Sequence, residues 1–233
     1  MATVILVRHG RTQANATGLL AGRTPGVGLD DTGVGQAEDA ARRVAGVCLA
    51  SIVTSPLQRC VETARALAAQ LPDVEVLQEE LLTECDYGEW QGRVLKELAE
   101  DALWAQVQAQ PSAVTFPGGE SMRAMQQRGV DAVRRHDERV AAEHGADAVW
   151  AAVSHGDVIK SVMADALGTH LDHFQRIRVD PASLSIIRYT DTRPYVICAN
   201  THAGDLGWLS APAPESTDAA VGGGAGPASG TGS

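Results

Sequence analysis

Three short apolar runs, each followed at once by a polar motif, constrain the fold of this chain more than any other feature. Residues 3–7 lead into R-H-G, residues 51–54 into S-P-L-Q-R, and residues 148–153 into S-H-G. Short apolar runs bounded by polar or turn residues are typical of strands buried in a sheet. Segments with helical spacing of apolar residues separate them. Strands that alternate with helices predict an α/β fold built on a largely parallel sheet.

The rest of the chain supplies further expected elements. These are helices near 33–48, 57–71, 92–109, 120–144 and 157–167, and strands at 74–77, 183–189 and 195–199. Ser55 and Pro56 are typical of the first positions of a helix, so we expect the helix after the second strand to begin there. Residues 10–32 are polar and rich in glycine, and a loop of that length in a compact domain is usually functional.

Length and composition predict one catalytic domain and a tail. The chain has 233 residues, of which 44% are hydrophobic, which suffices for one sizeable core. We place the domain at residues 1–210. Residues 211–233 are almost entirely Ala, Gly, Pro, Ser and Thr, a composition with little to bury. Such a segment is expected to be disordered.

Charge and cysteine content exclude several function classes. The formal net charge of −10 argues against non-specific binding to nucleic acid or to an anionic membrane. It leaves room for a small anionic substrate, because a local arginine cluster can override the global sign. No two of the four cysteines form a C-x-x-C pair, so neither a zinc site nor a disulfide framework is expected. The apolar run near the N-terminus is too short for a signal peptide or a membrane span, and we expect a cytoplasmic protein.

The polar motifs are predicted to converge. Ligands of parallel α/β sheets bind beyond the carboxyl ends of the strands, which places Arg8, His9, Arg59 and His155 on one edge. A neutral histidine such as His9 can act as a covalent nucleophile. Arginine forks bind phosphate oxygens in bidentate fashion, and a protonated His155 would add another donor. Phosphoryl transfer depends mainly on this kind of positioning and charge stabilisation.

A leaving alkoxide also needs a proton. Glu84, in L-T-E-C-D-Y-G-E-W, is our candidate for the general acid, and nearby phosphate charge should raise its pKa. Asp86 and Glu89 in the same segment are competing carboxylates that spacing alone does not separate from it.

Five ordered motifs between residues 3 and 199 carry a family resemblance. They are L-V-R-H-G-R-T-Q-A-N from residue 6, S-P-L-Q-R-C-V-E-T-A from residue 55, E-C-D-Y-G-E-W-Q-G from residue 84, P-G-G-E-S from residue 117 and S-H-G-D from residue 154. They resemble the histidine phosphatase superfamily, in its phosphoglycerate-mutase-like branch. The resemblance implies a three-layer α/β fold, whose mostly parallel sheet has helices on both faces and one antiparallel edge strand.

The resemblance also implies roles for single residues. His9 would be the phosphorylated nucleophile and Glu84 the proton donor. The implied phosphate pocket comprises Arg8, Arg59, His155, Asn15 and Gly156. The implied reaction has two steps and uses neither metal nor other cofactor. A small phosphorylated metabolite would be the substrate, and a homodimer is the family-level expectation for assembly.

Departures from the family pattern bear on specificity. Ala21-Gly22 stands where many relatives have Thr-Gly or Gln-Gly, so one side-chain contact is missing and Gly22 offers only its backbone. Mutases of the family carry a carboxylate-binding lysine at the position of Leu95, which Arg93 and Lys96 flank here. Arg93 is therefore the candidate for a substrate contact. These departures favour a phosphatase over a phosphomutase. The intact nucleophile and acid, His9 and Glu84, argue against the other alternative, a non-catalytic phosphate-binding protein.

Overall fold

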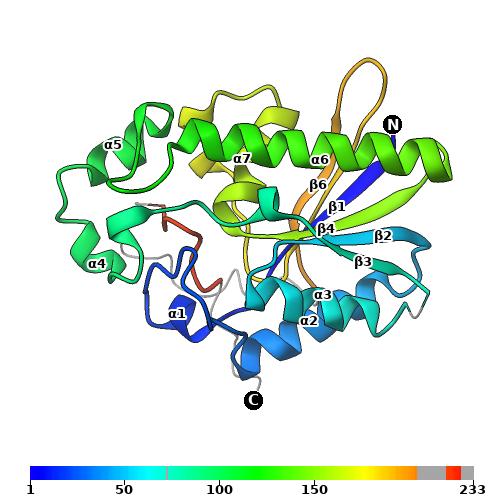
Figure 1. The fold of residues 1–233 in the computed structure, drawn as a ribbon, viewed down its shortest axis with the longest axis horizontal. Coiled ribbons are helices and arrows are strands. Elements are labelled where there is room, and N and C mark those ends of the chain that lie inside the picture. The colour runs from blue at the N-terminus through cyan, green and yellow to red at the C-terminus, as the bar shows by residue number, and fades with distance from the viewer. Residues whose placement is uncertain (72, 204–218, 227–233) are drawn as a thin grey trace.

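The centre of the molecule is a six-stranded sheet in the order β3-β2-β4-β1-β5-β6 (Figure 1). The computed structural model describes residues 1–71, 73–203 and 219–226. Strands β1 to β4 run parallel, and β5 is antiparallel to both of its neighbours, β1 and β6. The expected α/β fold is confirmed. The antiparallel strand lies one place inside the edge, with β6 outside it.

The described elements follow the predicted order. The strands are β1 (Thr3–Arg8), β2 (Leu49–Thr54), β3 (Glu75–Gln78), β4 (Val149–Ser154), β5 (Leu184–Arg188) and β6 (Tyr195–Thr201). The α-helices are α1 (Gln13–Ala16), α2 (Asp31–Val44), α3 (Gln58–Ala68), α4 (Leu95–Leu98), α5 (Trp104–Ala109), α6 (Met122–His144) and α7 (Gly156–Ala166). Short 3-10 helices are η1 (Glu80–Leu82), η2 (Gly88–Trp90), η3 (Pro111–Ala113) and η4 (Leu171–Arg176). The helix expected over 92–109 is divided into α4 and α5.

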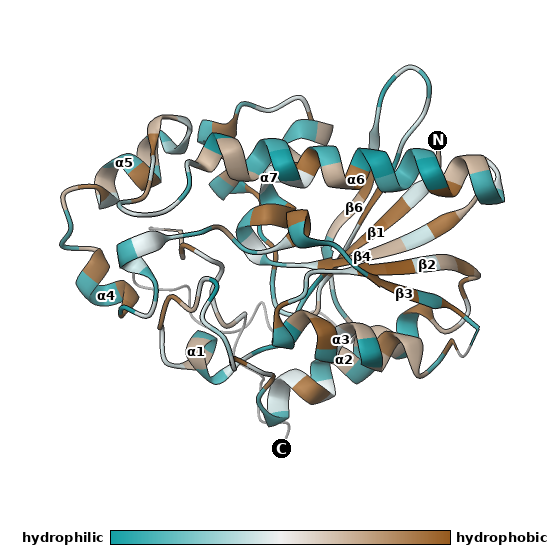
Figure 2. Ribbon diagram, viewed as in Figure 1, coloured by the Kyte–Doolittle hydropathy of each residue, from teal (hydrophilic) through white to brown (hydrophobic). Residues whose placement is uncertain are grey.

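Helices cover both faces of the sheet, which is why the central strands are apolar throughout. Helices α2 and α3 lie on one face, and α6 and α7 on the other (Figure 1). In β1, Val4 and Leu6 join the apolar cluster beneath α6 and α7, whereas Ile5 and Val7 join the cluster beneath α2 and α3. A strand buried on both sides carries apolar residues on both faces, and Figure 2 shows β1 and β2 as largely hydrophobic. None of the helices in the described ranges has the length and apolar run that crossing a bilayer requires.

A third apolar cluster forms a wall beyond the strand ends. It contains Tyr87, Trp90 and Phe116 and, from the C-terminal segment, Val221, which is 2% exposed. Residues 219–226 take a defined position, although composition predicts disorder for the tail, because Val221, between Ala220 and Gly222, packs into this apolar cluster. Residues 211–218 and 227–233 of the expected tail lie outside the described residues.

Candidate active site

The strand register brings the two motif histidines together. In the β1–β4 ladder Arg8 pairs with Ser154, so His9 and His155 leave the sheet at the same edge. Their ring centroids lie 5.3 Å apart, and both residues are buried. Residues that stand almost 150 positions apart in the chain thus come into ring contact at one edge of the sheet.

His9 presents an unprotonated nitrogen to this pocket. Its Nδ1 atom lies 2.7 Å from the carbonyl oxygen of Gly10, which can only accept, so we assign the ring proton to Nδ1. The Nε2 atom keeps its lone pair and accepts from Arg59 Nε over 3.3 Å. Burial, and then the charges of Arg59 and Arg8, hold the pKa of His9 well below its ordinary value. The ring is therefore neutral at pH 7.

Two buried guanidinium groups act on His9: Arg59 contacts its Nε2 atom directly, and the charge of Arg8 also reaches the ring. Arg59, near the start of α3, donates from Nη2 to the carbonyl of Gly22 over 2.7 Å. Arg8, at the end of β1, donates to the carbonyls of Val179 at 2.9 Å and Gly223 at 3.1 Å. Arg59 Nη1 and Arg8 Nε are buried and have no partner among the described residues. A buried donor left unpaired costs about 1–3 kcal/mol, so these atoms favour an anion that would accept from them.

His155 is held as a neutral acceptor in this state. Its Nδ1 atom lies 3.1 Å from Arg59 Nη2, which can only donate, and its Nε2 atom lies 2.8 Å from Ser55 Oγ. Burial, and then Arg59, lower the pKa of His155 well below its ordinary value. His155 would therefore add a donor only after taking up a proton, because no negative charge faces the ring closely enough to offset burial.

Glu84 is the one of the three candidate carboxylates that lines the pocket. Its Oε1 atom accepts from the backbone N–H of Cys85 at 2.9 Å. Burial, and then the charge of Asp157, raise the pKa of Glu84 to about 7. Asp86 lies outside the pocket, 3.7 Å from Arg23, and Glu89 is exposed. Burial in the pocket therefore favours Glu84 among the three carboxylates that spacing left open.

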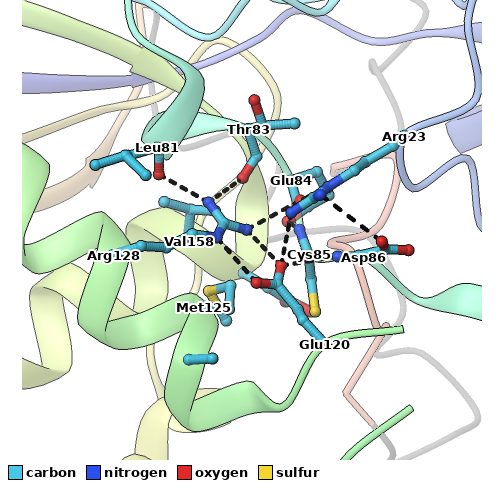
Figure 3. Close-up of polar contacts among 12 residues, drawn as sticks. Arg23, Leu81, Thr83, Glu84, Cys85, Asp86, Glu120, Met125, Arg128 and Val158 are labelled. Carbon is cyan, nitrogen blue, oxygen red and sulfur yellow. Dashed lines mark hydrogen bonds and ion pairs between the residues drawn. The ribbon is translucent and has the colours of Figure 1, made fainter. Parts of the chain in front are cut away.

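Two arginines hold the backbone of Glu84 from behind the pocket (Figure 3). Arg128, on α6, donates to the carbonyls of Thr83 at 2.6 Å and Glu84 at 3.1 Å. Arg23 Nε donates to the same Glu84 carbonyl at 2.8 Å. Glu120 accepts from both guanidinium groups, at 2.6 Å from Arg128 and 2.9 Å from Arg23. No local sequence pattern marks Arg128 or Arg23 as a partner of Glu84, so this framework is visible only in the structure.

Asp157 and Ser55 are further residues that the sequence analysis did not assign. Buried Asp157 accepts from Tyr87 Oη at 2.8 Å and from the Gly222 N–H at 3.0 Å. It directly follows the S-H-G motif, and that position could have identified it. The sequence predicts a helix start at Ser55, but α3 begins at Gln58. The Ser55 hydroxyl is hydrogen-bonded to His155 Nε2 instead.

The remaining predicted residues take different positions. Asn15 lines the pocket, but its side-chain oxygen accepts from the Thr12 N–H at 3.1 Å, which leaves only its amide nitrogen for a ligand. Gly22 lines the pocket through its backbone. Gly156 opens α7, where the backbone of Gly222 lies against it.

Arg93 is not brought into the pocket. Its side chain is directed to Asp101, at 3.8 Å, and is 43% exposed. Leu95 lines the pocket instead. The prediction of Arg93 as a substrate contact is therefore not supported, because neighbouring residues in a loop project in different directions. Within the described residues no group of three His, Cys, Asp or Glu side chains is arranged to hold a metal ion.

Comparison with known proteins decides the family. The model of the histidine phosphatase superfamily (branch 1) matches residues 4–202. The chain belongs to this superfamily. The predicted family is thus confirmed.

Several bacterial proteins resemble this chain over most of its length. Phosphoserine phosphatase 1 of Hydrogenobacter thermophilus is 30% identical over 213 residues, which cover 88% of this chain and 96% of that protein. The bifunctional protein Rv2228c of Mycobacterium tuberculosis is 34% identical over 190 residues, 80% of this chain, but the match spans only 50% of that longer protein. The solved structure of Bacillus stearothermophilus YhfR superimposes with a TM-score of 0.75 at 28% identity, covering 84% of this chain and 96% of that one.

Proposed function

We propose that this histidine phosphatase hydrolyses a small phosphate monoester through a phosphohistidine at His9, with Glu84 as general acid and then general base. The observation that carries the proposal is the pairing of a neutral His9 nitrogen with two buried guanidinium groups that each keep an unpaired donor. A dianionic phosphoryl group satisfies those donors and places its phosphorus beside the nucleophile.

In the first step His9 Nε2 attacks phosphorus and the bond from phosphorus to the ester oxygen breaks. Glu84, whose pKa of about 7 keeps much of it protonated at neutral pH, gives its proton to the leaving alkoxide. Arg8 and Arg59 stabilise the charge on the remaining phosphoryl oxygens. The alcohol leaves, and the phosphoryl group stays on His9.

In the second step water attacks the phosphohistidine. The Glu84 carboxylate takes a proton from this water as its oxygen bonds to phosphorus. The bond from phosphorus to His9 Nε2 breaks, and its electron pair returns to the ring. Inorganic phosphate and the starting state of both side chains are the products.

The pocket lining supports a phosphatase over a phosphomutase. A mutase of the phosphoglycerate type must bind the carboxylate of its substrate while the phosphoryl group changes position. Leu95 lines the pocket where a cation would serve that purpose, and Arg93 is directed to Asp101. Water is therefore the better acceptor for the phosphoryl group in this site.

Phosphate release from p-nitrophenyl phosphate by His9→Ala, with His170→Ala as control, tests the proposal. His170 is an exposed histidine paired with Asp172. We expect loss of turnover in His9→Ala alone, with an unchanged melting temperature. Rapid quenching of the wild type should show the mass of one phosphoryl group on the peptide that contains His9. Full turnover by His9→Ala would overturn the proposal.

A further inference from the structure

The C-terminal segment 219–226 runs through the pocket that the proposed mechanism needs. It appears as the red segment beside α1 and α4 in Figure 1. Val221, Gly222, Gly223 and Gly224 all line the pocket together with His9 and Arg59. The flanking residues 204–218 and 227–233 are not among those described.

Specific contacts fix this segment in place. The Gly223 carbonyl accepts from Arg8 Nη2 at 3.1 Å, and the Gly222 N–H donates to Asp157 at 3.0 Å. Gln108 exchanges two hydrogen bonds of 3.0 Å with the backbone of Ala219. The side chain of Val221 is buried in the apolar wall.

Little free space remains while the segment occupies the pocket. The cavity beside His9 measures about 30 Å³. A single water needs roughly 10–15 Å³ by such a measure, so about two waters fit. A phosphate monoester does not fit until the segment moves.

The Gly223 carbonyl also takes a donor that a phosphoryl oxygen would use. A neutral carbonyl is a weaker acceptor for a guanidinium than a phosphate oxygen, so phosphate can replace it. Binding then requires the segment to leave, and the apparent affinity falls in proportion to the fraction of open molecules.

We propose that residues 219–226 form an intramolecular plug that closes the phosphate site and competes with phosphate monoesters and inorganic phosphate. This inference rests on the proposed function, because it takes the competing ligand to be the phosphate group that the proposed reaction binds. Substrate affinity then depends on the fraction of molecules in which the plug has left the site, as well as on the contacts that the open site makes with the substrate.

Two neighbouring glycines provide a matched test. Gly223 has φ = +77°, and a Cβ atom there would lie 2.8 Å from Arg8 Cζ. Alanine at this position is strained and clashes, so Gly223→Ala should expel the plug. Among the described residues, a Cβ atom at Gly224 would meet only the Cβ of Ala220, at an ordinary 3.6 Å, so Gly224→Ala should leave the plug in place.

Calorimetric titration of the full-length protein with inorganic phosphate provides the measurement. We expect Gly223→Ala to bind phosphate about tenfold more tightly than the wild type and Gly224→Ala to bind it equally. Val221→Asp, which removes the apolar anchor, should also tighten binding. Equal affinity of Gly223→Ala and Gly224→Ala, or weaker binding by Gly223→Ala, would overturn the plug.

Turnover of p-nitrophenyl phosphate separates this proposal from the proposed function. If the plug is right and the chain is a phosphatase, KM falls in Gly223→Ala along with the dissociation constant. If the phosphate affinities follow the expected order but no variant releases phosphate, the plug stands and the hydrolysis fails. If turnover depends on His9 while the affinities do not respond, the hydrolysis stands and the plug fails.

Discussion

Arg59 donates from Nε to the Nε2 atom of His9 over 3.3 Å. The proposed nucleophilic nitrogen is therefore in contact with the guanidinium group that would bind the phosphoryl group. The contact occupies the lone pair of His9 in the empty site. A phosphoryl group that accepts from Arg59 competes for this contact and frees the lone pair when it is needed. The same positive charge lowers the pKa of His9 and keeps the ring neutral.

Arg59→Lys should lower kcat/KM by about 10²–10³-fold, because an ammonium cannot replace a fork that spans the phosphoryl group, His155 and Gly22. Steady-state kinetics with p-nitrophenyl phosphate measure the loss. Arg65→Lys, an exposed position on the same helix, is the control and should retain full activity. Equal rates for the two variants would remove Arg59 from the phosphate site.

Glu84→Gln should slow the hydrolysis of alkyl phosphates by about 10²–10⁴-fold, because the leaving alkoxide then receives no proton. In kcat/KM, which reports the first step, the effect should be much smaller with p-nitrophenyl phosphate, because its phenolate leaves without protonation; kcat still falls because Glu84 is also the base of the second step. For the wild type, kcat/KM for alkyl phosphates should decline above about pH 7, where Glu84 ionises, and Glu84→Gln should lose this decline. Glu89→Gln in the same segment is the control, and an equal loss there would argue against Glu84 as the acid.

Glu84 should also make stability depend on pH. Its pKa is about 7 in the folded protein against an ordinary value of 4.5, so the folded state binds the proton more tightly than the unfolded state. The resulting stabilisation is fully present below pH 4.5 and is lost as the pH rises through 7. The free energy of unfolding of Glu84→Gln, relative to the wild type, should therefore rise by about 3 kcal/mol at most between pH 4.5 and pH 8. Urea unfolding of both proteins at pH 4.5 and pH 8 measures this change. A free-energy difference between variant and wild type that does not depend on pH would contradict a buried, protonated Glu84.

Phosphate binding should be accompanied by proton uptake. In the empty site His155 is neutral, and an adjacent dianion raises the pKa of an imidazole. Calorimetric titration with phosphate at pH 7, in two buffers of different ionisation enthalpy, reports the number of protons taken up. We expect a smaller uptake in His155→Gln than in the wild type, and identical values would show that His155 stays neutral with phosphate bound.

Arg128→Met should lower kcat by roughly tenfold to a hundredfold, because the Glu84 backbone loses one of the two guanidinium groups that fix it. The affinity for inorganic phosphate should change little, since Arg128 does not line the pocket. The pH at which activity declines, near 7 in the wild type, should also shift, because Glu84 is no longer held in the same surroundings. Arg134→Met is the control on the same helix, α6; it removes a surface ion pair to Asp165 on α7. It should leave kcat, the phosphate affinity and the pH dependence unchanged. A loss of phosphate affinity equal to the loss of kcat would indicate general disruption rather than positioning.

The sheet and the meeting of the motif residues could be predicted because both follow from local patterns and one topological rule. Strand β1 shows its burial as an unbroken apolar run, and parallel strands deliver their carboxyl ends to one edge. The Arg128 contact with Glu84 could not be predicted, because 44 residues separate the partners and neither has a local signature. The position of Ser55 predicts a helix start, but a serine hydroxyl can either cap a helix or hydrogen-bond to a histidine, and no local signal separates the two roles.

The C-terminal segment shows where composition misleads. Composition averages over a whole tail and reports that it has little to bury. Val221 needs only one socket, and that socket is formed by residues from distant elements such as Leu20 and Tyr87. The number of apolar residues in a segment therefore says less than whether the folded domain leaves a matching space.

The pairing of Arg8 with Ser154 makes the active site sensitive to strand length. Successive side chains of a strand project to opposite sides, so deleting one residue from 3–7 would exchange the directions of Arg8 and His9. The guanidinium would then project where the imidazole belongs, although every residue of the motif would still be present. Insertions and deletions should for this reason be tolerated far less well in β1 and β4 than in the hairpin between β5 and β6, whose length sets the position of neither histidine.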